Sequence, residues 1–178
     1  MNIAAVKHLT GTSEVPATDV SPEALKAVMR RVAGTVSVIT AGGEDDRTGA
    51  TVTSATALSV DPATMIVNIN RSSSTWPVIS RHRHFCVNIL DTAHQEIAER
   101  FSGFGGIRGK QRYEGAEWTV LASGAPVLVG ALAAVDCEVE EVIERHSHAI
   151  IIGRVVGISF VGGAPLIYGL GRYGSVAS

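Results

Sequence analysis

The sequence of 178 residues has little charge and few cysteines. Charged residues make up 18% of the chain, the formal net charge is −2, and no stretch is strongly basic. Nucleic acid is therefore not an expected partner. The only two cysteines, Cys86 and Cys137, lie far apart in no metal-like spacing. This pattern argues against a small secreted scaffold held by disulfides.

Long apolar runs are also missing. A membrane-spanning helix needs about 20 consecutive apolar residues, and no run in this sequence approaches that length. The first twenty residues lack the apolar centre of a signal peptide. We therefore expect no membrane span and a cytoplasmic location. The length and the 46% hydrophobic content suit one domain with a real core, which we place at residues 21–178 behind a flexible arm at 1–20.

Several catalytic and binding motifs are absent. The sequence contains no Walker loop, no Gly-x-Ser-x-Gly elbow and no Ser-His-Asp order, so hydrolysis has little support. The glycines at 103–106 neither follow a strand nor open a helix, so they do not form a dinucleotide-binding turn. The pairs His82/His84 and His146/His148 have a spacing that places both rings on one side of a strand. No carboxylate or cysteine completes either set, so no metal site is predicted and zinc stays a minor alternative.

What is present is mostly β-forming sequence with a few helical segments. Ser21 and Pro22 are typical of a helix start and predict a helix at 22–32, and Thr92 with Gln95 resembles a capping box that opens a helix. Residues 35–41 and 48–58 read as the two arms of a hairpin. Residues 102–118 contain five glycines and read as a long, functional loop. The remaining predicted elements are strands at 64–70, 85–90, 135–140, 149–160 and 166–168, and helical turns at 75–81 and 92–101.

This order favours a mainly β fold with a few short helices. The connections are mostly hairpin-like, and regular alternation of strand and long helix is missing. A closed or nearly closed antiparallel barrel is therefore favoured over a parallel sheet.

Two clusters of small and hydroxyl residues, at 49–59 and 70–75, flank the apolar segment 65–69. Several neutral donors that converge near a helix start suit a phosphate group. The clusters therefore suggest a phosphate or ribityl-phosphate clamp. The alternative is structural, because threonine is a good strand former and serine a good loop former. The candidate ligands are Thr51, Thr53, Ser54, Arg71, Ser72, Ser73, Ser74 and Thr75.

His148 follows a polar turn and begins an apolar strand, where it could face a cleft and hold a ligand. The alternative is an ordinary surface histidine. Aromatic residues near the glycine-rich loops could stack on a flat ring or plug small cores. These are Trp76, Trp118, Tyr168 and Tyr173, with Lys110, Arg112 and Arg172 as the nearby cations.

Residues 32–40 (VAGTVSVIT), 49–55 (GATVTSA) and 58–62 (LSVDP) resemble the short-chain flavin reductase family, the reductase components of two-component flavin monooxygenases. The similarity continues in the same order over nearly all of residues 22–174. It includes 70–75, 85–90, 95–101, 124–126, 137–139, His148, 153–155 and 165–168.

The resemblance implies an FMN-binding split barrel, a homodimer with flavin near the subunit interface, FMN or FAD as cofactor, and NADH or NADPH as hydride donor. It implies that His148 positions the nicotinamide nucleotide. At Ala50 the family often has methionine or valine, and the loop 103–113 departs from the family pattern, which leaves a role for Lys110 open. The implied flavin contacts are Ala50, Thr51, Val52, Thr53 and Ser54 at the ring and ribityl chain, Asn68, Asn70, Arg71, Ser72, Ser73, Ser74 and Thr75 at the phosphate, Asn88 and Phe101 nearby, and Tyr168, Arg172 and Tyr173 in the tail.

The implied activity is hydride transfer from a nicotinamide to flavin, with reduced flavin passed to a separate monooxygenase. Two alternatives stay open at this point. One is a non-catalytic split-barrel protein that binds flavin or haem. The other is an enzyme similar to pyridoxamine-phosphate oxidases, which would need a basic phosphate site that the sequence does not reveal.

Overall fold

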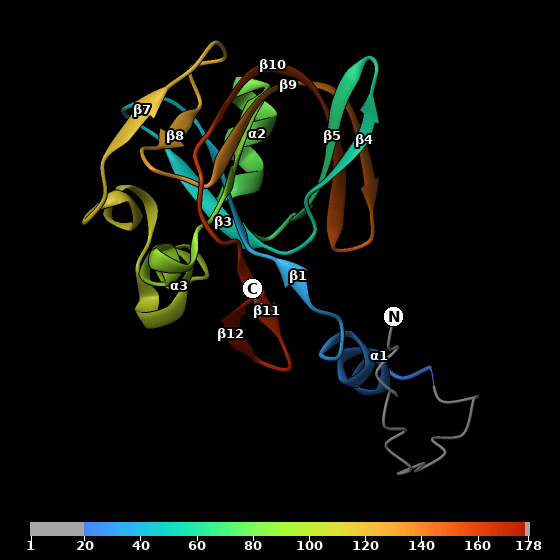
Figure 1. The fold of residues 1–178 in the computed structure, drawn as a ribbon. Helices are drawn as coiled ribbons and strands as arrows, with labels where there is room; N and C mark the ends of the chain where they lie inside the picture. Colours follow the sequence, from blue (N-terminus) through green and yellow to red (C-terminus); the bar gives the residue numbers. More distant parts are fainter. Residues whose placement is uncertain (1–19, 177–178) are drawn as a thin grey trace, which may run out of the picture.

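The computed structural model describes residues 20–176, and a curved antiparallel sheet dominates it (Figure 1). Seven strands pair in the order β3-β2-β6-β9-β10-β5-β4, and every neighbouring pair is antiparallel. The predicted mainly β, antiparallel barrel is therefore confirmed. The strands are β2 (Ser37–Ala41), β3 (Thr48–Val52), β4 (Thr56–Val60), β5 (Ala63–Asn70), β6 (His84–Ile89), β9 (Ala133–Arg145) and β10 (His148–Phe160).

The barrel is open between its two edge strands. β3 and β4 follow one another in the chain, joined by residues 53–55, yet they lie at opposite edges of the sheet. The long strands β9 and β10 curve round the core, with register shifts at Ile152/Gly153 and Val155/Gly157. A Cβ at Gly153 would lie 2.6 Å from the ring of Phe85, so only glycine lets the phenylalanine fill the barrel there.

Two helices complete the core. Helix α2 (Thr75–His82) lies across one end of the barrel and buries Val78 and Ile79 against β2, β3 and β5. Helix α3 (Gln95–Phe101) packs outside the barrel against β3 and contributes Phe101 to a second core. The aromatic rings of Tyr113 and Trp118 join that core at 5.1 and 5.6 Å from the Phe101 ring.

Smaller elements surround the barrel. Strands β1 (Gly34–Thr35), β11 (Leu166–Gly169) and β12 (Arg172–Ser175) form a three-stranded sheet below it, and β7 (Trp118–Val120) pairs with β8 (Pro126–Leu128) beside α3. Helix α1 (Pro22–Met29) lies apart and buries none of its residues. None of the helices in the described part of the chain has the length and apolar character required to span a bilayer. The remaining elements are the short 3-10 turns η1 (Thr92–His94), η2 (Phe104–Gly106) and η3 (Gly109–Tyr113).

The structure corrects the predicted hairpin at 35–58. Residues 48–58 are not one arm, because the chain leaves the sheet at 53–55 and crosses to the opposite edge. Local β propensity does not reveal such a crossing, since both halves are good strand sequence. The predicted helix at 22–32 ends at Met29, and the predicted arm at 1–20 lies outside the described residues except for Val20.

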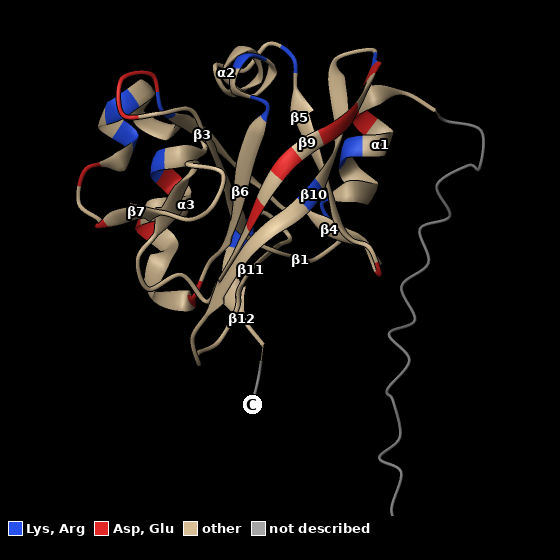
Figure 2. Cartoon of the chain, turned by 90° about the horizontal axis from the view of Figure 1, so that it is seen from above, with Lys and Arg blue, Asp and Glu red and all other residues tan. Residues whose placement is uncertain are grey.

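Other element predictions were also wrong in detail. The helix near residue 92 is capped by Asp91 and His94 rather than by Thr92 and Gln95, and it begins as a 3-10 turn. The loop 102–118 contains η2 and η3, and a further strand, β12, follows the predicted strand at 166–168. Asp136 of β9 is fully buried, and its carboxylate accepts hydrogen bonds from the backbone N–H and the hydroxyl of Ser123. The other acidic residues of β9 are exposed, and they mark the strand in red in Figure 2.

Candidate functional site

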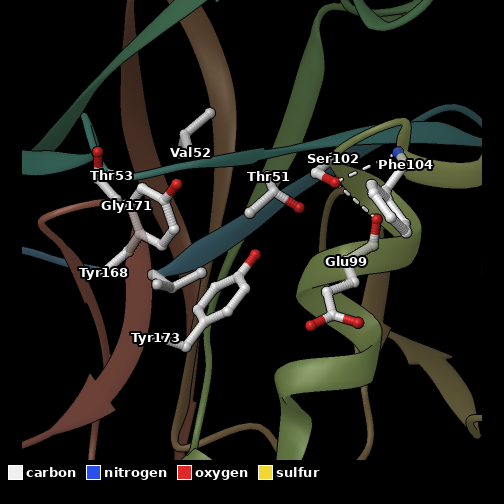
Figure 3. A pocket seen from close by; sticks show the side chains of 10 residues that line it. Thr51, Val52, Thr53, Glu99, Ser102, Phe104, Tyr168, Gly171 and Tyr173 are labelled. Carbon is white, nitrogen blue, oxygen red and sulfur yellow. Dashed lines mark hydrogen bonds between the residues drawn. The ribbon is translucent and has the colours of Figure 1, made fainter. Parts of the chain in front are cut away.

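A cavity of about 780 Å³ lies between the free edge of β3 and the β11–β12 hairpin (Figure 3). One wall is the strand segment that ends at Thr53, and the other contains Tyr168 and Tyr173. The C-terminal end of α3 and the following turn form the third side. The lining residues are Val36, Thr51, Val52, Thr53, Glu99, Ser102, Phe104, Tyr168, Gly171 and Tyr173.

Contacts with α3 fix the position of β3. The Thr51 hydroxyl donates a 2.6 Å hydrogen bond to the Ala98 carbonyl. A Cβ at Gly49 would lie 2.8 Å from the Phe101 ring, so glycine lets the helix approach the strand closely. Because β3 is an edge strand, the backbone groups that face away from β2 have no ladder partner. The part of this edge at the cavity therefore offers main-chain donors and acceptors beside a partly apolar wall, whereas the carbonyls of Gly49 and Thr48 are bonded by Arg112 and Tyr113.

The two tyrosines form the opposite wall. Their ring centroids lie 5.1 Å apart at 63°, and they face one another across the β11–β12 pair. The turn between the strands uses left-handed backbone at Leu170 and Gly171, which brings the rings together. Burial raises the pKa of Tyr173, with smaller contributions from the negative charge of Glu99 and from Tyr168. Tyr173 is thus a neutral phenol at neutral pH.

A second cavity of about 660 Å³ adjoins the first and shares Thr53, Tyr168 and Gly171 with it. Ser54 lies here rather than in the first cavity. Lys26 and Arg30 of α1 also line it, so this cavity carries positive charge that the first lacks. Arg172 lines a third, smaller cavity together with Tyr173.

The predicted phosphate loop, residues 70–75, does not line any of these three cavities. It lies instead at the other end of β3, where Ser74 Oγ is 3.2 Å from Thr48 Oγ1. The loop leads into the N-terminus of α2, and Ser74 makes no side-chain capping bond there. The hydroxyls of Ser73 and Thr75 are buried without a partner. This stretch therefore contains more polar groups than its own chain satisfies.

The charged and amide residues of that loop already have partners. Arg71 forms a 2.5 Å ion pair with Glu144 and donates to the His146 carbonyl at 3.2 Å. Asn70 accepts hydrogen bonds from the backbone and the hydroxyl of Ser72. Asn68, on β5, is half-buried opposite Ile150. Exposed Ser72 and Ser74 are thus the loop side chains most accessible to a ligand.

His148 begins β10 directly opposite Asn70 of β5. The structure therefore brings the predicted nicotinamide contact beside the hydroxyl loop, although the two are far apart in sequence. The ring is exposed, and its Nδ1 lies 2.8 Å from the hydroxyl of Ser147. His148 is not among the residues that line the cavity at β3.

Three further predicted contacts do not line the cavity at β3, and each has a structural role. Asn88 is fully buried, and its amide bonds the Val38 carbonyl and the Thr40 hydroxyl while its oxygen accepts from Leu128 N. Phe101 is buried in the core beside α3. Ala50 pairs with Ile39 inside the β2–β3 ladder.

Sequence reasoning assigned no role to four residues that line the cavity: Val36, Glu99, Ser102 and Phe104. The loop at 102–118 was expected to be functional, and its first residues do reach the cavity. Ser102 Oγ donates to the Glu99 carbonyl and accepts from Phe104 N, which fixes the turn after α3. Val36 and Glu99 lie in segments that carry the family resemblance, but no role was predicted for them, because their place in the cavity depends on how β2 and α3 pack.

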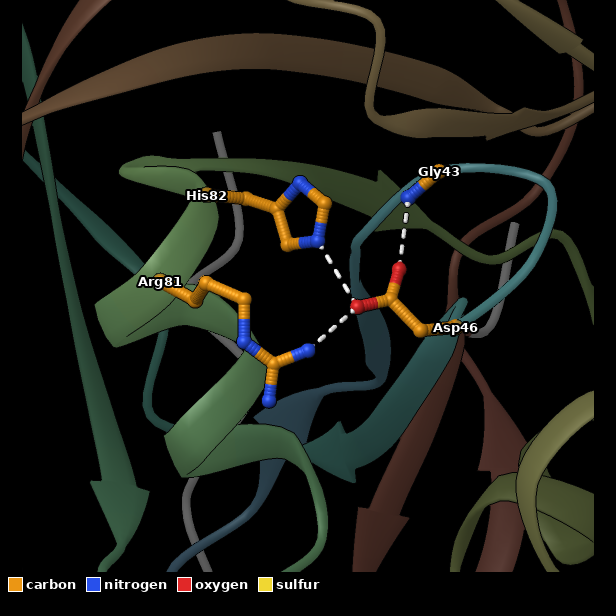
Figure 4. A network of polar contacts seen from close by, with 4 residues as sticks. All are labelled: Gly43, Asp46, Arg81 and His82. Atoms are coloured by element: carbon orange, nitrogen blue, oxygen red, sulfur yellow. Dashed lines mark hydrogen bonds and ion pairs between the residues drawn. The ribbon is translucent and has the colours of Figure 1, made fainter.

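A separate polar cluster lies at the turn between β2 and β3 (Figure 4). Asp46 accepts hydrogen bonds from Gly43 N at 3.2 Å and from Arg81 and His82 at 2.8 Å each. The hydrogen bond from His82 is the main cause that lowers the pKa of Asp46 below its ordinary value. In the described part of the chain, no three His, Cys, Asp or Glu side chains are grouped to hold a metal ion.

Comparison with known proteins gives a consistent result. Residues 29–177 match the family model described as a flavin reductase like domain. The chain is 35% identical over 154 residues to "FMN reductase (NADH) RutF 2" of Methylorubrum extorquens, covering 86% of this chain and 88% of that protein. It is 30% identical over 169 residues to "Flavin-dependent monooxygenase, reductase subunit HsaB" of Rhodococcus jostii, covering 94% and 85%. The crystal structure of a putative flavin reductase from Haemophilus somnus superposes with a TM-score of 0.84 at 28% identity, covering 88% and 100%.

Proposed function

The chain belongs to the flavin reductase-like family, and we propose that it transfers a hydride from NADH to FMN at the cavity between β3 and the β11–β12 hairpin. The observation that carries this proposal is the cavity itself, which joins the free edge of a strand to a wall of two tyrosines. The named activity of the relatives selects FMN and NADH among the flavins and nicotinamides that the sequence left open.

The cavity fits the ring system of a flavin. Its volume of about 780 Å³ lies within the range of small-molecule cofactor sites, roughly 300–1,000 Å³. A flat, partly polar ring needs an apolar surface on its face and donors or acceptors along its edge. Tyr168 and Tyr173 offer the first, and the unpaired backbone of β3 offers the second.

The phosphate of FMN would lie toward the hydroxyl loop. Strand β3 leads from the cavity at Thr53 to Thr48, which contacts Ser74. This distance of five residues is about 16 Å along a strand, so a long ligand could reach from one to the other. Its middle part would lie beside β3 rather than pair with it, because Arg112 and Tyr113 already bond the carbonyls of Gly49 and Thr48. The N-terminus of α2 and the exposed hydroxyls of Ser72 and Ser74 supply neutral donors for an anion.

The flavin supplies the redox chemistry, since it accepts a hydride from the nicotinamide. The protein's part is to bind and orient. Backbone N–H groups at the β3 edge would stabilise negative charge on the ring. The neutral Tyr173 phenol keeps its proton and serves as a hydrogen-bond donor rather than as a second anion beside Glu99. His148, beside the hydroxyl loop, would position the dinucleotide.

Anaerobic stopped-flow mixing with NADH and FMN tests the activity. Loss of the oxidised flavin absorbance at a rate that depends on protein concentration supports reduction by the enzyme. The same experiment with NADPH measures the nicotinamide preference. Tight FMN binding without any NADH consumption would instead support the non-catalytic carrier, and haem binding would be visible in the absorbance of the purified protein.

We also propose a homodimer and a separate oxygenase partner. Helix α1 exposes Leu25, Val28 and Met29, and the edge strand β4 exposes Leu58 and Val60. Such apolar exposure on an edge strand and a free helix is unusual for a monomer. Light scattering coupled to gel filtration measures the mass, and a Val28→Glu variant should shift a dimer toward monomer. The relative named as a monooxygenase reductase subunit supports delivery of reduced FMN to a second protein.

A further inference from the structure

A pocket of about 290 Å³ lies between the β2–β3 turn and the β7–β8 hairpin, and it shares no residue with the cavity at Thr53. Its charged lining residues are Arg47 and Glu44, and Trp118 provides an aromatic surface. Val120 and Pro126 complete an apolar side. This pocket therefore combines one fixed cation, one aromatic ring and a small apolar wall.

Arg47 is held in place but has no anionic partner. Its Cζ atom lies 4.5 Å from the centroid of the Tyr113 ring, as in a cation–π contact. Its Nε atom is buried and makes no hydrogen bond. Arg112, which precedes Tyr113 in the chain, differs, because its guanidinium donates to the carbonyls of Ile107 and Gly49. Within residues 20–176 the guanidinium of Arg47 forms no ion pair.

The pocket walls are fixed before any ligand arrives. Asp46 ties the β2–β3 turn to α2 through Arg81 and His82 and closes the turn through Gly43 N (Figure 4). On the other wall, Trp118 Nε1 donates to the Tyr113 carbonyl at 3.0 Å, and the two rings meet edge to face with centroids 4.7 Å apart. A ligand would therefore lose little affinity to ordering of the protein.

We propose that this pocket binds a small aromatic carboxylate, with the carboxylate on Arg47 and the ring against Trp118 and Pro126. A guanidinium that forms no ion pair presents the N–H groups of its two Nη atoms in the forked geometry that a carboxylate accepts, whereas the buried Nε does not face the ligand. The pocket is too small for a dinucleotide or a flavin, and its aromatic and apolar sides favour a single ring. Glu44 lines the same pocket and disfavours a second negative charge on the ligand.

Isothermal titration calorimetry with benzoate, in the presence of saturating FMN, measures the binding. Benzamide has the same shape without the charge and serves as the ligand control. Arg47→Gln should weaken benzoate binding about 10- to 100-fold, and Arg47→Lys should give an intermediate loss because a single ammonium cannot form the fork. Glu44→Gln should strengthen binding about 2- to 5-fold because it removes a like charge at the rim.

Lys110→Gln is the matched protein control, because Lys110 is a surface cation paired with Asp45 outside this pocket. It should leave benzoate binding unchanged. If Lys110→Gln and Arg47→Gln weaken benzoate binding equally, the effect comes from net charge alone and the proposal is overturned. Equal affinity for benzoate and benzamide, or no heat with benzoate up to millimolar concentration, would overturn it as well. Saturating FMN keeps benzoate out of the flavin cavity, and failure of the reductase activity would leave this result unaffected.

Discussion

Both ends of β3 lie beside hydroxyl-rich sequence, but they differ in whether the hydroxyl groups have hydrogen-bond partners within the protein. At the cavity end, the Thr51 hydroxyl is committed to the Ala98 carbonyl, and the free surface consists of strand edge and tyrosine rings. At the loop end, the hydroxyls of Ser73 and Thr75 are buried without partners, and Ser74 does not cap its helix. At the cavity end the Thr51 side chain is therefore satisfied within the protein, whereas the loop end retains unsatisfied polar groups.

This difference assigns separate tasks to the two ends. A wall of strand edge and aromatic rings recognises a flat ring by shape and by a few edge contacts. A helix N-terminus with neighbouring hydroxyls recognises an anion. This division of tasks can be tested with riboflavin, which has the ring and the ribityl chain of FMN but lacks the phosphate. A change at the ring end should affect both flavins, and a change at the phosphate end should affect FMN alone.

The largest expected effect comes from blocking the ring end. Thr53 is exposed in the cavity, so Thr53→Trp should fold normally and fill the space with an indole. The dissociation constants of FMN and of riboflavin should both rise about 100-fold, since the loss concerns the ring. Fluorescence titration of each flavin measures this. Thr56→Trp, on exposed β4, is the matched control and should change neither constant. Normal riboflavin affinity in Thr53→Trp would place the ring elsewhere.

The next effect should separate the two flavins. The double variant Ser72→Ala/Ser74→Ala removes the exposed hydroxyls of the loop. Binding of FMN should weaken about 10-fold, because each lost hydrogen bond to an anion is worth roughly 1 kcal/mol or more. Riboflavin affinity should stay constant, because riboflavin has no phosphate to lose.

The cationic cavity beside α1 is the rival place for the phosphate. Lys26→Gln/Arg30→Gln removes its two charges. If this pair weakens FMN selectively while the serine pair does not, the phosphate lies toward α1 and the assignment of the loop is wrong. If neither pair distinguishes FMN from riboflavin, the phosphate faces solvent.

A smaller effect concerns the histidine beside the loop. His148→Ala should raise the KM for NADH about 5-fold and change kcat little, because a positioning residue contributes mainly to binding. Steady-state kinetics at saturating FMN separate the two parameters. His146→Ala is the matched control, since this histidine lies in the preceding turn. Loss of kcat at unchanged KM would show that His148 acts in the chemical step.

Sequence patterns predicted the barrel because its evidence is local. Alternating and β-branched runs mark strands such as β5 and β10, and a proline after a serine marks the start of α1. The resemblance to flavin reductases further indicated Thr51, Val52, Thr53, Tyr168 and Tyr173, and these five residues do meet at one cavity.

The remaining lining residues depend on long-range packing. Glu99 reaches the cavity only because α3 packs on β3 through Gly49, Phe101 and the Thr51 hydrogen bond. Asn88 is the converse case, because it was a predicted contact and is buried in the core. An amide on a central strand is equally suited to a ligand and to the core, and only the positions of Thr40 and Leu128 show that its bonds are used inside the protein.

The smallest effect tests whether the turn that begins β3 supports its loop end. Asp46 holds that turn to α2, so Asp46→Asn should lower Tm by about 2–4 °C at pH 7. The bonds to His82, Gly43 and Arg81 lower the pKa of Asp46 from its ordinary value of 3.8. Their stabilisation is therefore present above about pH 4 and is lost as pH falls through the lower folded pKa.

The difference in Tm between wild type and Asp46→Asn should accordingly shrink below pH 4. Asp45→Asn is the matched control, because Asp45 is fully exposed in the same turn. FMN affinity should fall slightly in Asp46→Asn while riboflavin affinity is unchanged, since Thr48 and Ser74 lie near this turn and Thr53 does not. An equal loss for both flavins would mean that β3 moves as one rigid strand, and that its two ends cannot be assigned separate tasks by mutation of the turn.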